Sequence, residues 1–145
     1  MSDKYSTTVT INASPATVWH TLTTPELMTA WMGEPEMEVK VITDWKPDSP
    51  IIIRGFHHVA FENKGVVLQY DREQTLSYSH LSNTSRLSDI PENYSILTFL
   101  LTPGEEGTAL TLNITNFPTE VIQKHLEFYW RTTIVKIKKI IEGSL

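Results

Sequence analysis

The sequence predicts an α+β fold in which a curved antiparallel sheet wraps around a long C-terminal helix, with two short helices after the first strand. Three features predict it: two helix-start signals near the N-terminus, β-type patterning through the middle of the chain, and one amphipathic stretch near its end. The 145 residues and the 40% hydrophobic content favour a single domain, residues 1–145, with enough apolar material for a core.

The N-terminal elements follow from alternation and from capping residues. In residues 5–11, Tyr, Thr, Val and Ile occupy every second position, which is typical of a strand. Ser14-Pro15 then supplies an N-cap side chain followed by proline at the first helical position, where the missing N–H costs nothing. Thr24-Pro25 repeats this signal. We therefore expect two short helices in tandem rather than one long helix.

The middle of the chain is rich in β-branched and aromatic residues, which indicates strands. Turn sequences, Asn63-Lys64-Gly65 among them, separate these segments. Such tight connections predict antiparallel pairing, because parallel strands need long crossovers. Residues 83–91 form the longest polar break and are expected to be a mobile loop. The predicted strands are residues 37–42, 51–57, 61–70, 75–81, 94–101 and 108–115.

The last element is predicted to be one helix that opens at Phe117-Pro118 and stops at Gly143. A helix of about 24 residues is about 36 Å long, enough to cross a whole sheet. A lysine cluster at residues 136–139 lies near its carbonyl end, where cations are favoured, so we interpret the cluster as structural. The apolar stripe of this helix comprises Ile122, Leu126, Tyr129, Trp130, Thr133, Ile137 and Ile140.

Composition excludes several classes of function. The formal net charge is −5 and the basic residues are scattered, so no nucleic-acid partner is expected. The chain has no cysteine, which rules out disulfides, thiolate metal sites and a cysteine nucleophile. Its polar N-terminus lacks the apolar stretch of a signal peptide, and no apolar run approaches the roughly 20 residues of a membrane span. We expect a cytoplasmic protein with no membrane span.

Several segments occur in an order that is typical of one superfamily. NASPATVWHTLTTPELMTAWM at residues 12–32 is followed by GVVLQY, SILTF, GTALTLNI and finally YWRTTIVKIKKIIE. Together they resemble the START-like, or Bet v 1-like, superfamily (SRPBCC), which has the helix-grip fold. Within it, the chain looks most like homologues of the C-terminal domain of activator of Hsp90 ATPase. One departure is Tyr129, which stands where glycine commonly precedes the tryptophan of the last helix and is expected to narrow any cavity.

The resemblance implies a cavity between the concave sheet and the long helix. Members of the superfamily bind lipids, sterols, polyketides or other apolar molecules, and a minority are enzymes. The chaperone-activating role belongs to a larger protein with an additional N-terminal domain, so we do not expect it to carry over. The first hypothesis is therefore a binding domain for a small apolar or amphipathic ligand, such as a lipid or a polyketide- or flavonoid-like molecule.

Aromatic and neighbouring residues that could face this cavity are the candidate ligand-binding residues. Apolar walls with a few polar groups are what a small-molecule pocket requires, although each residue singly also suits a packed core. Trp31 is expected at the mouth of the cavity, whereas Trp19 is expected to hold the first short helix against the sheet. The candidate ligand-binding residues are Met28, Trp31, Phe56, Tyr78, His80, Phe99, Tyr129, Trp130 and Thr133.

Two alternatives remain open beside ligand binding. His80 shares a strand face with Tyr78, so one alternative is a cyclase- or hydrolase-like enzyme that uses His80 or the Tyr78 hydroxyl in the cavity. A chaperone- or stress-associated protein-interaction module is the other. His57 and His58 are adjacent in a predicted strand, point to opposite faces and are not expected to bind a metal. No nucleophile elbow, phosphate loop or dinucleotide motif is present, so no catalytic residue or cofactor is assigned and binding is favoured over catalysis.

Overall fold

The structure is a computed structural model that describes residues 3–143. It confirms the predicted α+β architecture. Four residues of the predicted domain, Met1, Ser2, Ser144 and Leu145, lie outside the described residues. The elements in chain order are β1 (Lys4–Ile11), α1 (Pro15–Thr23), α2 (Pro25–Met32), β2 (Lys40–Thr43), β3 (Pro50–His57), β4 (Val59–Asp71), β5 (Thr75–Ser82), β6 (Ser95–Gly104), β7 (Gly107–Thr115) and α3 (Glu120–Glu142). Three short 3-10 helices interrupt the loops at Pro35–Met37, Asn83–Ser85 and Pro91–Asn93.

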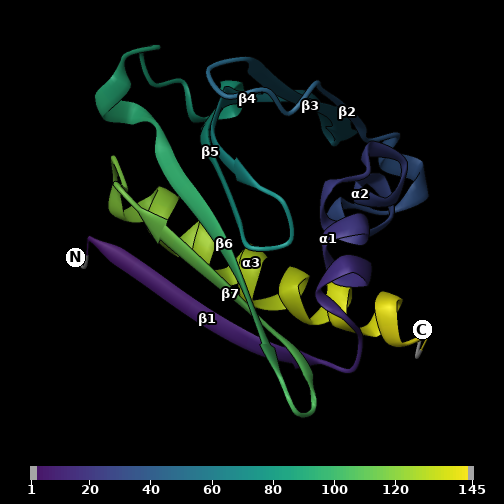
Figure 1. Cartoon of the computed structure of the whole chain (residues 1–145). Coiled ribbons are helices and arrows are strands. Elements are labelled where there is room, and N and C mark those ends of the chain that lie inside the picture. The colour runs from purple at the N-terminus through teal and green to yellow at the C-terminus, as the bar shows by residue number, and fades with distance from the viewer. Residues whose placement is uncertain (1–2, 144–145) are drawn as a thin grey trace.

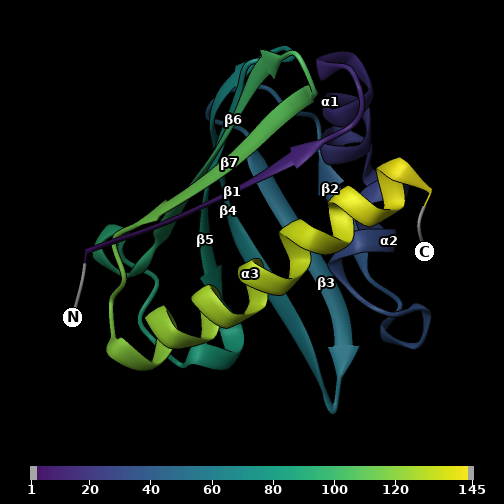
Figure 2. The same ribbon diagram turned by 90° about the horizontal axis from the view of Figure 1, so that it is seen from below.

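The strands form one seven-stranded antiparallel sheet in the order β1-β7-β6-β5-β4-β3-β2. Figures 1 and 2 show this sheet curving over α3, which crosses it diagonally, while α1 and α2 lie together at one end. The hairpin of β3 and β4 extends past α3 (Figure 2). This is the arrangement in which a sheet grips a helix, with the space between them closed by the two short helices.

Helices α1 and α3 begin where the side chain of the N-cap residue satisfies a free backbone N–H. The Ser14 hydroxyl accepts a hydrogen bond from the Thr17 N–H and caps α1, as predicted. Helix α3 starts at Glu120, two residues after the predicted proline, because the Thr119 hydroxyl accepts from the Ile122 N–H. It ends at Gly143, whose φ of 72° is the left-handed conformation that favours glycine at this position. None of the helices in residues 3–143 is long and apolar enough to cross a membrane.

Two local predictions are wrong. Asn63-Lys64-Gly65 is not a turn, because β4 runs through it without a break and pairs with β3 on one side and β5 on the other. The strand predicted for residues 37–42 begins only at Lys40, because Pro35–Met37 forms a 3-10 turn and Glu38 has a left-handed φ of 50°. The first error arises where a local turn signal competes with strand pairing, and the second where a strand-like pattern competes with a turn that starts at Pro35.

Lys138, in the lysine cluster at the end of α3, makes structural contacts. Lys138 donates to the Thr10 carbonyl oxygen of the edge strand β1 and pairs with Glu142 at 3.0 Å. The Glu142 carboxylate in turn accepts from the Asn12 N–H at 2.8 Å. Backbone groups at the end of an edge strand are thereby covered by side chains of α3.

The core lies between the concave face of the sheet and the inner stripe of α3. Leu76, Tyr78, Leu97, Phe99 and Leu112 face inward from neighbouring strands and are at most 2% exposed. The predicted stripe of α3 meets them, with Leu126, Trp130, Thr133 and Ile137 buried and Ile122, Tyr129 and Ile140 partly buried. Apolar burial on both layers therefore fixes the helix across the sheet.

Candidate functional site

A continuous row of aromatic rings runs through the interior from α1 to α3. Neighbouring rings in this row have centroids 5.1–6.3 Å apart, within the range in which aromatic pairs attract. Both short helices, β4, β5, β6, α3 and the loop between β2 and β3 contribute to it. This aromatic row consists of Trp19, Tyr70, Trp45, Tyr78, Phe99, Trp130, Trp31 and Tyr129.

Three polar atoms of the aromatic row bond to backbone carbonyl oxygens, and the Trp19 indole N–H bonds to the Tyr70 hydroxyl. The Trp31 indole N–H donates to the Thr21 carbonyl oxygen at 3.0 Å, and the Trp45 indole N–H donates to the Thr23 carbonyl oxygen at 2.6 Å. The Tyr129 hydroxyl donates to a carbonyl at the end of α2, 2.7 Å away. These hydrogen bonds connect the three rings to the two short helices and fix the orientation of the rings.

The Tyr78 hydroxyl is the exception. It is buried and has no hydrogen-bond partner, unlike the other buried side-chain N and O atoms of residues 3–143. Burial raises the pKa of Tyr78 above its usual value, so the hydroxyl is protonated and can donate. It lines a cavity of about 10 Å³ together with Ile51, Ile53, Asn63 and His80. This cavity has room for one polar atom of about the size of water.

His80 lies on the same face of β5 as Tyr78, two residues further along. Burial of its ring and, to a smaller extent, the nearby His125 of α3 lower the pKa of His80 to about 4. The imidazole is therefore neutral at pH 7 and offers one N–H donor and one N acceptor. A protonated phenol and a neutral imidazole thus border the same small cavity.

Sequence comparisons identify the family of the chain. Residues 12–142 match the family described as Activator of Hsp90 ATPase homolog 1-like protein. The chain belongs to this family. The AHSA1-like assignment agrees with a solved relative, ChR145 from Cytophaga hutchinsonii, which is 35% identical over 97% of this chain and 94% of that chain, with a TM-score of 0.79.

More distant structures share the AHSA1-like fold. CV1439 from Chromobacterium violaceum has a TM-score of 0.81 at 14% identity, covering 97% of this chain and 99% of that chain. The Aha1 dimer from Colwellia psychrerythraea has a TM-score of 0.76 at 19% identity, covering 97% of each chain. A search of curated proteins finds no match. The resemblance inferred from the sequence is therefore confirmed at the level of family and fold.

The structure brings eight of the nine candidate residues to the interior of this AHSA1-like domain. Trp31 is only 1% exposed and contacts Trp130, so it lies inside the core and not at a mouth. Phe56 is separate from the others, because it lies near the tip of the β3–β4 hairpin and is 53% exposed. Within the described residues, the interior candidates are Met28, Trp31, Tyr78, His80, Phe99, Tyr129, Trp130 and Thr133.

Two members of the aromatic row were not predicted, Trp45 and Tyr70. Trp45 lies on the loop between β2 and β3 with a left-handed φ of 60°, and its ring stacks on Tyr70 at 5.8 Å. A tryptophan inside the polar run TDWKPDSP was the available signal, because a large apolar ring in a turn usually returns to the core. Of the rings in the row, Trp45 is the one that a loop carries, whereas the others lie on helices or strands.

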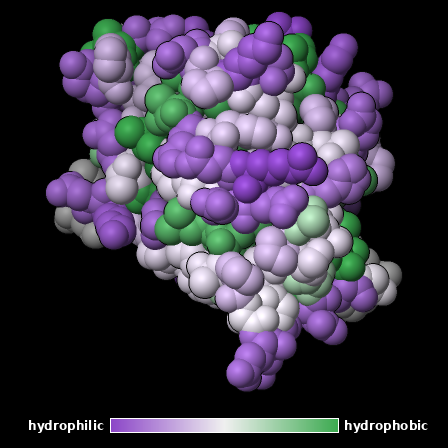
Figure 3. Space-filling model, viewed as in Figure 1, coloured by the Kyte–Doolittle hydropathy of each residue, from purple (hydrophilic) through white to green (hydrophobic). Residues whose placement is uncertain are grey.

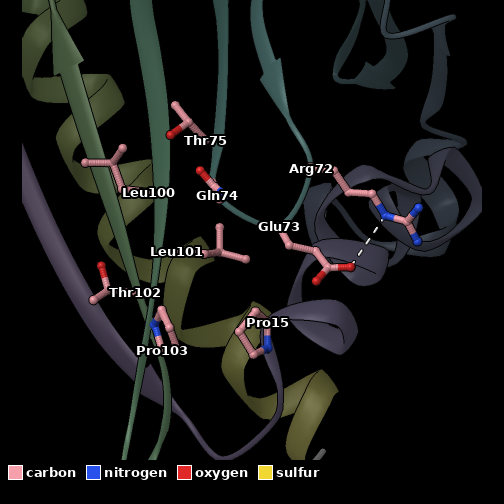
Figure 4. Close-up of a pocket in the computed structure, with 9 residues that line it drawn as sticks. All are labelled: Pro15, Arg72, Glu73, Gln74, Thr75, Leu100, Leu101, Thr102 and Pro103. Atoms are coloured by element: carbon pink, nitrogen blue, oxygen red, sulfur yellow. Dashed lines mark ion pairs between the residues drawn. The ribbon is translucent and has the colours of Figure 1, made fainter.

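A separate groove of about 630 Å³ lies on the described surface. It lies between the β4–β5 turn, the end of β6 and Pro15 (Figure 4). Arg72 pairs there with the adjacent Glu73 at 3.4 Å, and its side chain is 81% exposed. The groove is open and its charged side chains already neutralise each other, so we do not assign it a ligand.

The outer surface carries apolar side chains in scattered positions. The face shown in Figure 3 is mostly hydrophilic or intermediate, with small hydrophobic groups between. On the β3–β4 hairpin, however, Phe56 and Val59 are 53% and 57% exposed and flank the tip. His57 and His58 have ring centroids 4.5 Å apart, because His58 is in the turn with a φ of 66°, so the predicted opposite orientation is wrong. Within residues 3–143 they join no group of three or more metal-ligating side chains.

Proposed function

We propose that this AHSA1-like domain binds a small, mainly apolar ligand between the concave face of the sheet and α3. The observation that carries the proposal is the buried Tyr78 hydroxyl without a partner beside the 10 Å³ cavity. An unpaired buried hydroxyl destabilises a fold by about 1–3 kcal/mol, so its presence needs an explanation. A ligand that accepts a hydrogen bond from this hydroxyl provides one.

Apolar contact supplies the affinity in this proposal. A ligand that buries about 200–300 Å² gains roughly 5–7 kcal/mol before the costs of association. The cavity itself is too small for such a ligand, so a ring must move out. Trp45 lies on a loop, and its ring centroid is 6.3 Å from that of Tyr78. Its displacement would open a path to the Tyr78 hydroxyl.

Tyr78→Phe is expected to stabilise the free protein and to weaken ligand binding. The variant removes an unpaired buried hydroxyl, so the free energy of unfolding should rise by about 1 kcal/mol. The affinity for 2-naphthol, an aromatic probe with one hydroxyl, should fall about fivefold to tenfold. Urea unfolding and NMR titration measure the two effects.

Tyr129→Phe is the matched control for this experiment. Its hydroxyl donates to the Met32 carbonyl oxygen, so its removal should lower stability and leave 2-naphthol binding nearly unchanged. Equal losses of affinity in both variants, or a Tyr78→Phe protein that is less stable than wild type, would contradict the role of the Tyr78 hydroxyl.

Trp45→Ala is expected to strengthen binding of 2-naphthol severalfold, because the probe no longer has to displace the indole ring. The same change should lower the free energy of unfolding by about 2–3 kcal/mol through lost packing and the lost hydrogen bond to Thr23. Isothermal calorimetry measures the affinity. Phe128→Ala, which removes a ring that is 68% exposed on α3, is the control and should change neither quantity much. An unchanged affinity in Trp45→Ala would mean that the ligand enters elsewhere.

A protein-interaction role is the second candidate, and the exposed Phe56 and Val59 at the hairpin tip favour it. Projecting apolar side chains are typical of surfaces that contact another protein. The family description names Hsp90 ATPase, so the ATPase rate of a purified Hsp90 titrated with this chain is the direct test. A rate increase that Phe56→Ser and Val59→Ser together abolish would support this role. No effect of the wild-type chain would count against it.

A further inference from the structure

The inference that the structure carries furthest concerns the chemical class of the ligand, and it rests on the proposed function. We propose that the interior takes an uncharged alcohol or phenol and rejects carboxylates. Tyr78 and His80 line one cavity with room for a single polar atom, so both can reach the same ligand group. The hydroxyl of an alcohol or phenol fits both, because it accepts from the Tyr78 O–H and donates to the unprotonated nitrogen of His80.

A carboxylate would find no free positive charge at this cavity. Lys64 also lines the cavity, but it follows Asn63 in β4, so its side chain points to the opposite face of the sheet. There it pairs with Asp89, and the resulting hydrogen bond raises the pKa of Lys64 and lowers that of Asp89. The cation is therefore already neutralised on the convex side.

Three other cations near α3 and the hairpin are also paired. Lys136 donates to Glu34 and to the Gly33 carbonyl oxygen, Lys138 pairs with Glu142, and Arg54 pairs with Glu62. His125, the titratable group of α3 that influences His80, is exposed at the outer side of the helix start. Among the residues that the structure describes, the groups lining the cavity are thus neutral at pH 7, apart from Lys64, which faces away.

This arrangement makes a carboxylate bind only after a proton is taken up. A carboxylic acid with an ordinary pKa of about 4.3 is protonated in roughly one molecule in 500 at pH 7. Protonating His80 instead is harder still, because burial opposes its charge. Neutral and ionised ligands of the same shape should therefore differ in affinity by more than about 100-fold at neutral pH.

Three probes of nearly the same shape test the inference: 2-naphthol, naphthalene and 2-naphthoate. Wild-type protein is titrated with each by calorimetry and by NMR at pH 7.5, 6.5 and 5.5. We expect 2-naphthol to bind at least 100-fold more tightly than 2-naphthoate at pH 7.5 and about tenfold more tightly than naphthalene. The affinity for 2-naphthoate should rise about tenfold for each unit by which the pH falls, whereas that for 2-naphthol should stay constant.

Tyr78→Phe provides the matched variant, and it should lose most of the preference for 2-naphthol over naphthalene. Binding of 2-naphthoate as tight as that of 2-naphthol, or independent of pH, would overturn the inference while leaving ligand binding intact. Equal affinity for 2-naphthol and naphthalene would overturn the hydroxyl requirement in the same way. If none of the probes binds at any pH, the proposed function fails and this inference fails with it.

Discussion

Gly65→Ala is expected to lower the free energy of unfolding by about 4 kcal/mol. A β-carbon built on Gly65 would lie 1.8 Å from the Ser79 carbonyl oxygen and 2.4 Å from its carbonyl carbon. These are backbone atoms of the neighbouring strand β5, so no side-chain rotation can relieve the clash. The two strands would have to separate at the centre of the sheet, where Val66 N–H also donates to the Ser79 hydroxyl at 3.0 Å.

Urea unfolding monitored by tryptophan fluorescence measures this change. Gly104→Ala is the matched control, because the nearest atom to its added carbon is 3.9 Å away, an ordinary contact. We expect the free energy of unfolding of the control to differ from that of the wild type by less than about 1 kcal/mol. If Gly65→Ala is as stable as Gly104→Ala, β4 and β5 do not approach as closely in solution as the structure places them.

The stability of the wild-type protein is expected to fall by about 3 kcal/mol between pH 7 and pH 4 because of His80 alone. The pKa of this group is about 4 in the folded protein and about 6.5 in the unfolded chain. Between these values the unfolded state binds the proton and the folded state does not, so acid favours unfolding. The stabilisation is therefore present above pH 6.5 and is lost as the pH falls toward 4.

Other groups also contribute at low pH, so the difference between two proteins is the quantity to measure. Asp89 and Glu142 have a lowered pKa through their hydrogen bonds to Lys64 and to the Asn12 N–H, and they lose that stabilisation in acid as well. His80→Gln removes only the histidine contribution, so its unfolding free energy should fall less steeply between pH 6.5 and 4.5. Parallel curves for wild type and His80→Gln would contradict the burial of a neutral imidazole.

Much of the fold could be predicted because its signals are local. The Ser14-Pro15 pair starts α1 and Gly143 ends α3, since capping groups act within a few residues of the backbone atoms they satisfy, while Pro25 occupies the first turn of α2. The period of the apolar stripe likewise placed one long helix against a sheet. The turn predicted at Asn63-Lys64-Gly65 is absent. Gly65 instead allows β4 to approach the backbone of Ser79, which is 14 residues away in the sequence.

The candidate site was predicted by residue type more than by geometry. Tyr78, Phe99 and Trp130 could be assigned to the interior, because large aromatic residues at strand and helix periods face the core. Phe56 followed the same pattern, but it lies on the β3–β4 hairpin, which extends past α3 (Figure 2). The length of this hairpin depends on the pairing of β3 with β4. Trp45 was missed because a loop, which has no periodicity, returns it to the aromatic row.

The sequence by itself thus determined the family, the order of the elements and an interior rich in aromatic rings, because these depend on local capping, periodicity and composition. Only the tertiary structure decided that the Tyr78 hydroxyl has no partner, that His80 borders the same 10 Å³ cavity and that Lys64 is paired on the opposite face. The physical reason is that burial and hydrogen-bond satisfaction depend on residues brought together from distant strands, whose spacing no single segment encodes.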